Sequence, residues 1–472
     1  MLKLLLMLLL SSVHCFQPSP GVVNSVKSPI INGNRVVQTR LFAQIPDWNG
    51  KPARVNFITS HGPDLYVCTD TTGGLIYKVT PWGQVSMFFN VADAIFRTTG
   101  RRMSFANRIH GGLRSLAFHP LFSENGLLYV SAMEEKPTEP WRFRYLSTPP
   151  KTARADSVVI EFRYDFKQNR VLSWTYREVL RIGVPVFDHP IRQIGFYWRN
   201  LYISHGDGSV QSATAGGGQR NDALGKILRI NPLKHGNQPY SIPFLNPFVN
   251  TWRMPEIYAT GFRNPHNFCF GKWGELFVTD VGRDNFEEIN IVKPGANYGW
   301  SEREGNARHL PGGGLLSGIA PLPWNDSAYG YTYPNVILGH AARYGRRFVG
   351  QAISSSCPIE NTSPLSNTIL FSNFPTGDMY YSLLSEMRFA NTTGAPWQLS
   401  SARVFRPRIF FDHDNNPNTP PIRVQRLLDI VQMDPRFASE KRVDVRFGRG
   451  PSGEIYWSSK KNGRIYLITN SM

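Results

Sequence analysis

Short runs of apolar residues recur along the chain, each starting after a turn with Leu-Tyr or an equivalent pair and continuing with small or β-branched residues. The runs are GPDLYVCTD, NGLLYVSAM, RNLYISHGDG, WGELFVTDVG, SNTILFSNF and SGEIYWSSKKNGRIYLIT. They lie roughly 60 to 95 residues apart, and such similarity between separated units is typical of a repeat architecture. Long amphipathic helical patterns are nearly absent, and 41 Gly and 35 Pro interrupt the chain often. The six units predict an all-β fold, a six-bladed β-propeller with four strands in each blade.

The two ends of the chain are expected to meet in this fold. Residues 34–45, NRVVQTRLFAQI, predict a strand that pairs with GRIYLITN at 463–470 and closes the ring. A propeller binds its ligand at one mouth of the ring, in loops that connect the strands of several blades. Three loops therefore form the expected site: 188–226, 261–288 and 371–378.

The first 15 residues, MLKLLLMLLLSSVHC, predict a secretory signal peptide with a basic start, an apolar centre and small residues at the cleavage position. The apolar run is shorter than the roughly 20 residues that a membrane-spanning helix needs. We therefore expect a secreted protein without a membrane span, with an N-terminal segment at 16–49 and a propeller domain at 50–472. Three glycosylation sequons predict a glycosylated face: Asn325, Asn361 and Asn391.

Charge is unbalanced, because 52 Lys and Arg residues against 34 Asp and Glu residues give a formal net charge of +18. A field of this sign attracts polyanions such as sulfated, heparin-like glycans. The basic residues are dispersed along the chain, and no nucleic-acid-binding module is recognisable, so nucleic acid is not an expected partner. We expect a monomer whose ligand is a sugar or an extracellular protein or glycan.

Cysteines are few for a secreted chain. Removal of the signal peptide with Cys15 leaves Cys68, Cys269 and Cys357, an odd number that cannot pair completely within one chain. Cys68 and Cys269 lie in strand-like runs and are interpreted as buried small hydrophobic residues. The sequence thus predicts a fold that is held together by its apolar core rather than by disulfides.

Several motifs in order along the chain resemble the glucose/sorbosone dehydrogenase family, which includes soluble quinoprotein sugar dehydrogenases and Hedgehog-interacting-protein-like proteins. These motifs are GGLRSLAFHPLFSENGLLYV, DALGKILRINP, PEIYATGFRNP, TDVGRDNFEEINIVKPGANYGW and FGRGPSGEIYWSS. NQPYSIPFLNPFV and NYGWSEREG are most similar to the Hedgehog-interacting-protein-like branch. The resemblance implies a six-bladed propeller, in agreement with the repeated strand pattern.

The resemblance also implies a chemistry. In the enzymatic members a histidine takes a proton from a sugar hydroxyl while hydride passes to pyrroloquinoline quinone. By this resemblance His189 is the base, Asp188 orients it, and Arg263 and Asn264 contact the quinone. A base beside an electropositive acceptor suits the removal of a proton and a hydride from one carbon. From the residues alone, Arg263 could instead pair with Asp280 or Glu288 to tie two loops together.

The family places a calcium ion against the quinone, and the resemblance implies that the backbone carbonyls of Gly282 and Arg283 hold it. Two further positions beside the implied cofactor depart from the family pattern. His110 stands where the enzymes commonly have Gln or Glu, and Arg192 replaces part of a Gly-rich step. The side chains of His110 and Arg192 are therefore expected next to the cofactor.

Other departures concern the cationic residues that hold the carboxylates of the quinone. Pro375 lies where a basic residue is expected, and the later Arg pair is shifted to Lys441–Arg442 or to Arg446. Two hypotheses follow. The retained motif residues favour a quinoprotein sugar dehydrogenase, whereas the altered cofactor positions favour a catalytically silent relative that binds an extracellular protein or glycan.

Overall fold

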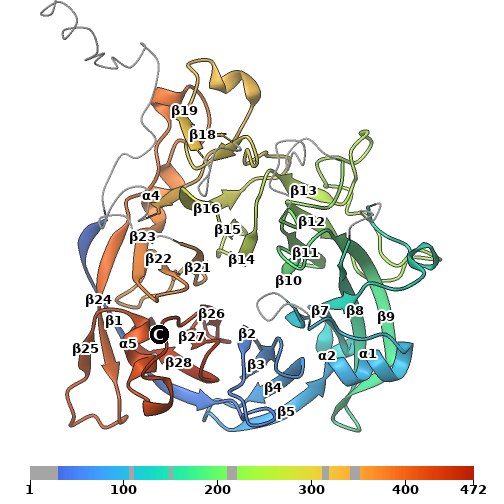
Figure 1. Ribbon diagram of the computed structural model, residues 1–472, viewed down its shortest axis with the longest axis horizontal. Coiled ribbons are helices and arrows are strands. Elements are labelled where there is room, and N and C mark those ends of the chain that lie inside the picture. The colour runs from blue at the N-terminus through green and yellow to red at the C-terminus, as the bar shows by residue number, and fades with distance from the viewer. Residues whose placement is uncertain are drawn as a thin grey trace, which may run out of the picture.

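The sheets of this computed structural model stand around a common centre, as Figure 1 shows. The structure describes residues 30–105, 111–147, 153–209, 221–310, 318–340 and 351–471. Its helices are short and lie outside the sheets: α1 (Val91–Thr99), α2 (Phe122–Asn125), α4 (Leu384–Phe389) and α5 (Leu427–Gln432). None of the helices in these ranges is long and apolar enough to cross a membrane. The expectation of an all-β fold is confirmed.

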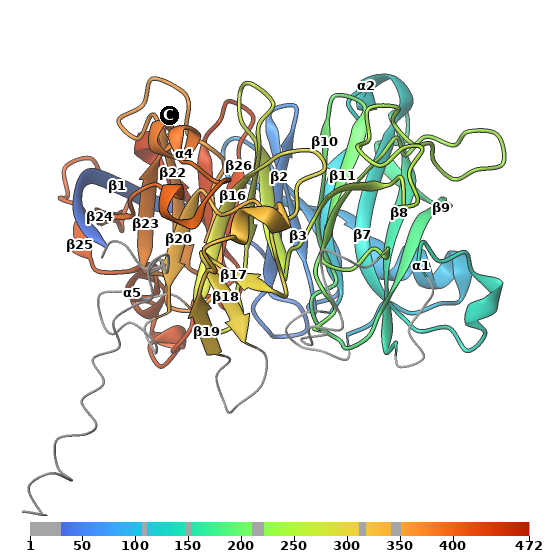
Figure 2. The ribbon, with the colours of Figure 1, turned by 90° about the horizontal axis from the view of Figure 1, so that it is seen from above.

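Three four-stranded sheets each follow the order of their strands along the chain. The first contains β6 (Leu113–Phe118), β7 (Leu127–Glu135), β8 (Ala155–Asp165) and β9 (Arg170–Val184). The second contains β10 (Ile191–Tyr197), β11 (Asn200–His205), β12 (Lys226–Ile230) and β13 (Ile257–Thr260). The third contains β14 (Pro265–Phe270), β15 (Leu276–Asp280), β16 (Phe286–Val292) and β20 (Val336–Gly339). A small sheet, β17 (Arg303–Glu304), β18 (Ala307–Leu310) and β19 (Gly318–Pro321), is inserted before β20. Figure 2 views the ring from its side, with α2 and β19 at opposite ends of its axis.

The remaining strands form one continuous 13-stranded sheet. It runs through β21 (Ile353–Ser355), β22 (Thr368–Asn373), β23 (Met379–Leu383), β24 (Phe405–Asp412) with β25 (Ile422–Val424), β1 (Ile31–Gln44), β28 (Arg464–Ile468), β27 (Ile455–Ser459), β26 (Val445–Arg449), β2 (Val55–His61), β3 (Asp64–Thr69), β4 (Leu75–Val79) and β5 (Val85–Asn90). Because this sheet is continuous, the count of six separate blades stays a prediction.

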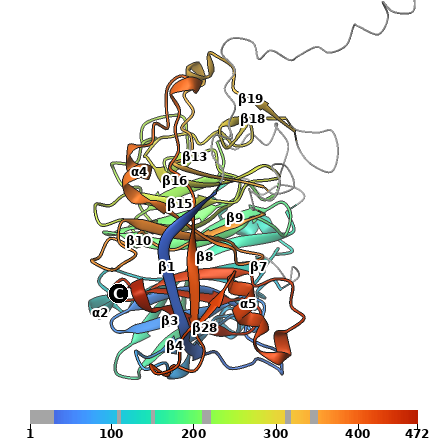
Figure 3. The same cartoon turned by 90° about the vertical axis from the view of Figure 1, so that its left-hand side faces the viewer.

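The N-terminal strand joins the end of the chain. β1 pairs antiparallel with β28, with Leu41 opposite Tyr466, and parallel with β24 on its other side. Figure 3 shows β1, in blue, among the red strands of the C-terminal part. The run at 34–45 therefore lies beside the strand for which it was expected.

Apolar side chains fill the spaces between neighbouring sheets. One cluster packs Cys68 and Ile76 of the β2–β5 strands against Leu116, Val130 and Ile160 of the next sheet. Strands such as β7 are buried along almost their whole length. Since both faces of such a strand contact other sheets, its sequence is a continuous apolar run rather than an alternating one. This explains why the LLYV-type motif repeats.

Four inner strands carry a bulge at the same position. In β2, β6, β10 and β14 the pairing register shifts across the second residue of the strand. The extra residues are Asn56, Arg114, Arg192 and His266. A bulge leaves its extra residue out of the ladder and changes the direction of its side chain. The repeated bulges thus give the second residue of each of these strands a side-chain direction that differs from the regular alternation of the strand.

A disulfide joins Cys269 to Cys357, 88 positions later, whereas Cys68 is buried and free. The interpretation of Cys68 as a buried hydrophobic residue is confirmed, but the same interpretation of Cys269 is wrong. Cys357 follows β21, the strand next to β14, and Asn267 of β14 donates to the backbone oxygen of Ser355 at 2.9 Å. This neighbourhood arises only when the sheets assemble, so the spacing of the cysteines could not reveal it.

Candidate functional site

His189 lies in the loop between β9 and β10, where its side chain is buried. Its backbone φ is 49°, in the left-handed region that residues with a side chain rarely adopt. Such a conformation costs of order 1–3 kcal/mol and persists only where the surrounding contacts impose it. The loop therefore holds this imidazole in one specific position.

Asp207 and Trp300 fix the orientation of the His189 ring. Nδ1 of His189 lies 2.6 Å from Oδ1 of Asp207, and Nε1 of Trp300 donates to the other oxygen, Oδ2, at 2.9 Å. A carboxylate can only accept, so Nδ1 carries the proton, and in the neutral ring Nε2 keeps its lone pair. All three side chains are buried. This arrangement can present an oriented imidazole base.

Asp188, the residue expected to orient His189, has a different place. Its Oδ1 accepts the backbone N–H of His189 at 2.9 Å, and its Oδ2 accepts the hydroxyl of Ser209 at 2.9 Å. Oδ2 is 3.5 Å from Nε2 of His189. Asp188 thus supports the loop, while the short contact to the ring belongs to Asp207. The sequence signal that was missed is the Asp in SHGDG, at the end of β11.

The Arg263-Asn264 pair is anchored through its backbone. Both backbone N–H groups donate to the carboxylate of Asp280, at 2.9 and 2.6 Å. The Arg263 side chain donates through Nη1 to the carbonyl oxygens of Val281, at 2.9 Å, and Gly282, at 2.6 Å. Arg263 therefore ties two loops together, but through carbonyl oxygens rather than through a side-chain ion pair with Asp280.

Two atoms of this pair keep unused hydrogen-bonding capacity. Nε of Arg263 and Oδ1 of Asn264 are buried without a hydrogen-bond partner in the part of the chain that the structure describes. Buried polar atoms are nearly always satisfied, and the exceptions gather at functional sites. These two atoms are suited to contact a polar ligand.

Backbone contacts bring the His189 and Arg263 loops together. The backbone N–H of Asp207 donates to the backbone oxygen of Arg263 at 2.8 Å. A Cβ atom at Gly206 would lie 2.7 Å from Cβ of His189 and 3.1 Å from the Arg263 oxygen, so only glycine fits between them. The structure therefore unites the candidate residues Asp188, His189, Arg263, Asn264 and Gly282 in one place. His110 lies outside the described residues.

One of the two carbonyl oxygens proposed for calcium, that of Gly282, is already engaged. The carbonyl oxygen of Gly282 already accepts from Arg263, which brings a positive charge to within 2.6 Å of the oxygen that calcium would need. Arg283 donates its backbone N–H to Glu304, at 2.8 Å, and its side chain contacts Asp284. Among the described residues no group of three or more His, Cys, Asp or Glu side chains could hold a metal ion.

Two buried carboxyl groups lie behind this site. Asp280 and Glu288 are opposite each other on the paired strands β15 and β16. Burial raises the pKa of both groups. The charge of Asp207 raises the pKa of Asp280 further, and the charge of Asp280 raises that of Glu288. The cluster therefore tends to retain a proton near neutral pH.

The remaining expected positions differ in their surroundings. Arg192 is buried and lines a cavity of about 230 Å³ at the centre of the ring, together with Arg446. Arg442, the alternative to Arg446, is about half exposed and pairs with Asp444 at 2.8 Å. Of the sequons, Asn325 and Asn391 are exposed and Asn361 is half-buried. Glycosylation stays a prediction.

Comparison with known proteins agrees with the motifs. Residues 82–309 match the family described as Glucose / Sorbosone dehydrogenase. HIPL2 protein of Arabidopsis thaliana is 29% identical over 324 residues, which make up 60% of this chain and 45% of that protein. Quinoprotein glucose dehydrogenase B of Acinetobacter calcoaceticus is 26% identical over 253 residues, 51% of this chain and 48% of that protein. The matches thus span less than half of the length of these two curated relatives.

The fold has solved counterparts. The PQQ-bound form of aldose sugar dehydrogenase from Streptomyces coelicolor aligns over 93% of this chain and 98% of its own, with a TM-score of 0.55 and 17% identity. At this identity the likeness concerns the fold, and it agrees with sheets placed around one centre. The family resemblance is confirmed by this match, which covers residues 82–309 of the chain.

Proposed function

We propose that this chain is a secreted oxidoreductase, a six-bladed propeller that oxidises a hydroxyl group of a sugar with pyrroloquinoline quinone as cofactor. The observation that carries the proposal is the hydrogen-bonded series from Trp300 through Asp207 to His189. The matched relative whose name is quinoprotein glucose dehydrogenase B supports the choice of cofactor and substrate class. In the six-bladed arrangement the 13-stranded sheet supplies three blades: β2–β5, β21–β24, and β26–β28 with β1.

In this proposal His189 is the general base. Asp207 holds the proton on Nδ1, so Nε2 receives the proton of the sugar hydroxyl. The positive charge that then develops on the ring is stabilised by the Asp207 carboxylate, which Trp300 holds in place. A positioned base of this kind contributes about 10²- to 10⁴-fold to a rate.

The residues present fit a bound quinone at the Arg263-Asn264 pair. When bound, pyrroloquinoline quinone would supply an acceptor for the hydride that leaves the sugar carbon. Nε of Arg263 is a buried donor without a partner among the described residues and would hold an oxygen of the quinone. The Oδ1 atom of Asn264 is likewise without a partner among those residues, and exchange of the amide atoms would offer a second donor. Calcium has no role in this proposal, because the carbonyl oxygen of Gly282 accepts a hydrogen bond from Arg263.

One observation favours a second candidate function. The same Arg263–Gly282 contact occupies the expected calcium position, and the side chain of Arg192 lines the central cavity. A chain altered in this way could bind a sugar or an extracellular protein or glycan without catalysis. The +18 charge would favour a heparin-like glycan among such partners.

The two candidates are distinguished by reconstitution. Purified full-length protein is incubated with pyrroloquinoline quinone, with and without calcium, and quinone binding is measured by absorbance. Reduction of an artificial dye is then followed with glucose and other aldoses as substrates. Dye reduction that His189→Ala abolishes, while quinone binding persists, supports the oxidoreductase.

Folded protein that binds no quinone at any calcium concentration overturns the enzymatic proposal and leaves the binding candidate. Chromatography on heparin then tests that candidate. Retention should disappear toward molar salt, where the screening length falls to about 3 Å. Elution together with a neutral control protein at physiological salt would reject the glycan partner.

A further inference from the structure

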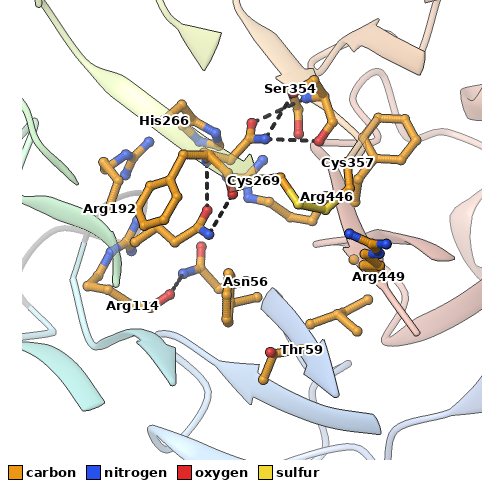
Figure 4. Close-up of a pocket in the computed structure, with 18 of the residues that line it drawn as sticks. Asn56, Thr59, Arg114, Arg192, His266, Cys269, Ser354, Cys357, Arg446 and Arg449 are labelled. Atoms are coloured by element: carbon orange, nitrogen blue, oxygen red, sulfur yellow. Dashed lines mark hydrogen bonds between the residues drawn. A yellow bond between two sulfur atoms is a disulfide. The ribbon is translucent and has the colours of Figure 1, made fainter. Parts of the chain in front are cut away.

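Three buried arginines and one buried histidine surround the cavity at the centre of the ring. The members of this cluster are Arg114 of β6, Arg192 of β10, His266 of β14 and Arg446 of β26. Figure 4 shows their side chains around one cavity, which has a volume of about 230 Å³. The volume is several times the roughly 30 Å³ that one water molecule occupies in the liquid. The cavity can therefore hold a small molecule or ion.

The backbone places these side chains there. Each is the second residue of its strand, and Arg114, Arg192 and His266 are the extra residues of the bulges described above. A bulge of this kind frequently aims a side chain at a functional site. Three arginines thus reach the same space from three different sheets.

Three carboxylates lie near the cluster, and each also has other partners. Asp188, whose charge acts on Arg114 and Arg192, accepts from the backbone of His189 and from the Ser209 hydroxyl. Asp70 forms a short contact with Lys460 and receives Nε of Arg54 at 3.1 Å, whereas Nη1 of Arg114 is 4.0 Å away. Asp444 accepts both donors of Arg442. The guanidinium groups of the cluster therefore carry positive charge that these carboxylates neutralise only in part.

Two buried nitrogen atoms of the cluster have unused hydrogen-bonding capacity. Nε of Arg114 and Nδ1 of His266 are buried and have no hydrogen-bond partner within the described ranges. Burial, followed by repulsion from Arg192, Arg446 and Arg114, lowers the pKa of His266. Burial lowers the pKa of Arg446 to about 10, and Arg114 opposes its charge as well. Like charges held together away from water are destabilising unless an anion lies between them.

We infer that the central cavity is a binding site for a small multivalent oxyanion, held by Arg114, Arg192 and Arg446. Planar guanidinium groups match the oxygens of phosphate, sulfate and carboxylate by paired hydrogen bonds. The shared chemistry is an oxyanion with two or more negative charges, either free in solution or part of an organic polycarboxylate. The inference goes beyond the proposed sugar oxidation, since binding of an inorganic oxyanion requires neither a quinone nor catalysis.

The test uses titration of the full-length protein with sodium sulfate, inorganic phosphate or citrate, each against chloride at equal ionic strength. Binding is measured by calorimetry, and the thermal unfolding midpoint is recorded in parallel. The unaltered protein should bind one oxyanion per chain and gain thermal stability that saturates with its concentration. Saturation separates this effect from general stabilisation by salts that are excluded from the protein surface.

Arg446→Gln tests the assignment to the cavity. It should weaken oxyanion binding by about tenfold or more, since a charged donor is lost from a buried site. Without an oxyanion the variant should unfold at a higher temperature than the unaltered protein, because one of the repelling charges is gone. Arg408→Gln, at an exposed position on β24, is the matched control and should leave both quantities unchanged.

The outcomes separate the possible sources of the oxyanion. Binding of sulfate or phosphate that Arg446→Gln weakens supports a free inorganic ligand, and binding of citrate alone supports a polycarboxylate. No saturable binding of any of the three, or equal binding by Arg446→Gln and Arg408→Gln, would overturn the inference. Oxyanion binding and the unfolding midpoint can both be measured in protein that shows no dehydrogenase activity.

Discussion

The indole nitrogen of Trp300 donates a hydrogen bond to Oδ2 of Asp207 at 2.9 Å, although the two residues are 93 positions apart. The other oxygen of the same carboxylate lies 2.6 Å from Nδ1 of His189. The connection between β16 and β17, which carries Trp300, thus helps to determine how the imidazole is oriented. The first prediction concerns this carboxylate.

Asp207→Asn should lower the rate of sugar-dependent dye reduction by about 10²- to 10⁴-fold, because the ring loses the acceptor that sets its tautomer and stabilises its charge. Quinone binding should persist. Asp188→Asn is the control and should cost less, since Asp188 contacts mainly the backbone of His189. ¹⁵N NMR of the imidazole reports the tautomer even without turnover. Equal losses in the two variants would assign the orienting role to both residues and contradict the prediction.

Trp300→Phe removes the N–H donor and part of the ring volume, while it keeps an aromatic ring near Arg263, whose Cζ lies 5.8 Å from the indole centroid. One oxygen of a buried carboxylate then loses its partner, which should lower the free energy of unfolding by about 1–3 kcal/mol. Urea unfolding measures this loss. Trp82→Phe, at a residue that is 84% exposed, should change it by less than about 0.5 kcal/mol. A loss in Trp82→Phe as large as that in Trp300→Phe would refute the assigned bond.

The buried carboxyl group of Glu288 should make the stability of the protein depend on pH. Burial raises the pKa of Glu288 in the folded state. Because the folded-state pKa lies above the unfolded-state pKa, the protonated carboxyl contributes its full share of the unfolding free energy below the unfolded-state pKa. That share is lost as pH rises through the folded-state pKa. Glu288→Gln, which imitates the protonated carboxyl, should therefore flatten the decline of unfolding free energy between mildly acidic and mildly alkaline pH. Glu124→Gln, at an exposed position, should keep the slope of the unaltered protein. An unchanged slope in Glu288→Gln would show that the group ionises normally.

The Cys269–Cys357 bond closes a loop of 88 positions, for which chain entropy predicts roughly 4 to 5 kcal/mol of stabilisation. Replacement of both residues by Ser should lower the free energy of unfolding by about 2–5 kcal/mol. The reducing agent dithiothreitol should destabilise the unaltered protein to a similar degree and leave the double variant unaffected. Destabilisation of the double variant by the reducing agent would point to a different disulfide.

A site residue could be predicted from the sequence when it stands in a short, recognisable motif, and could not when its role depends on contacts with distant residues. His189, Arg263 and Asn264 stand in short motifs, so the sequence was sufficient to name them as candidates. Asp207 was missed because its motif, SHGDG, also suits an ordinary turn after a strand. Calcium at Gly282 was inferred from the same motifs, but the carbonyl oxygen accepts from Arg263, a contact that depends on how two loops meet.

The sequence by itself determined the all-β fold and the strand at 34–45, because a strand that packs between two sheets must be apolar along its length and must end at turns. Only the tertiary structure decided which residues from different sheets came together: Cys269 with Cys357, Trp300 with Asp207, and three arginines around one cavity. Each of these contacts joins positions far apart in the chain. Their geometry depends on the packing of whole sheets and on the bulges that turn single side chains toward the centre, and no local pattern encodes it.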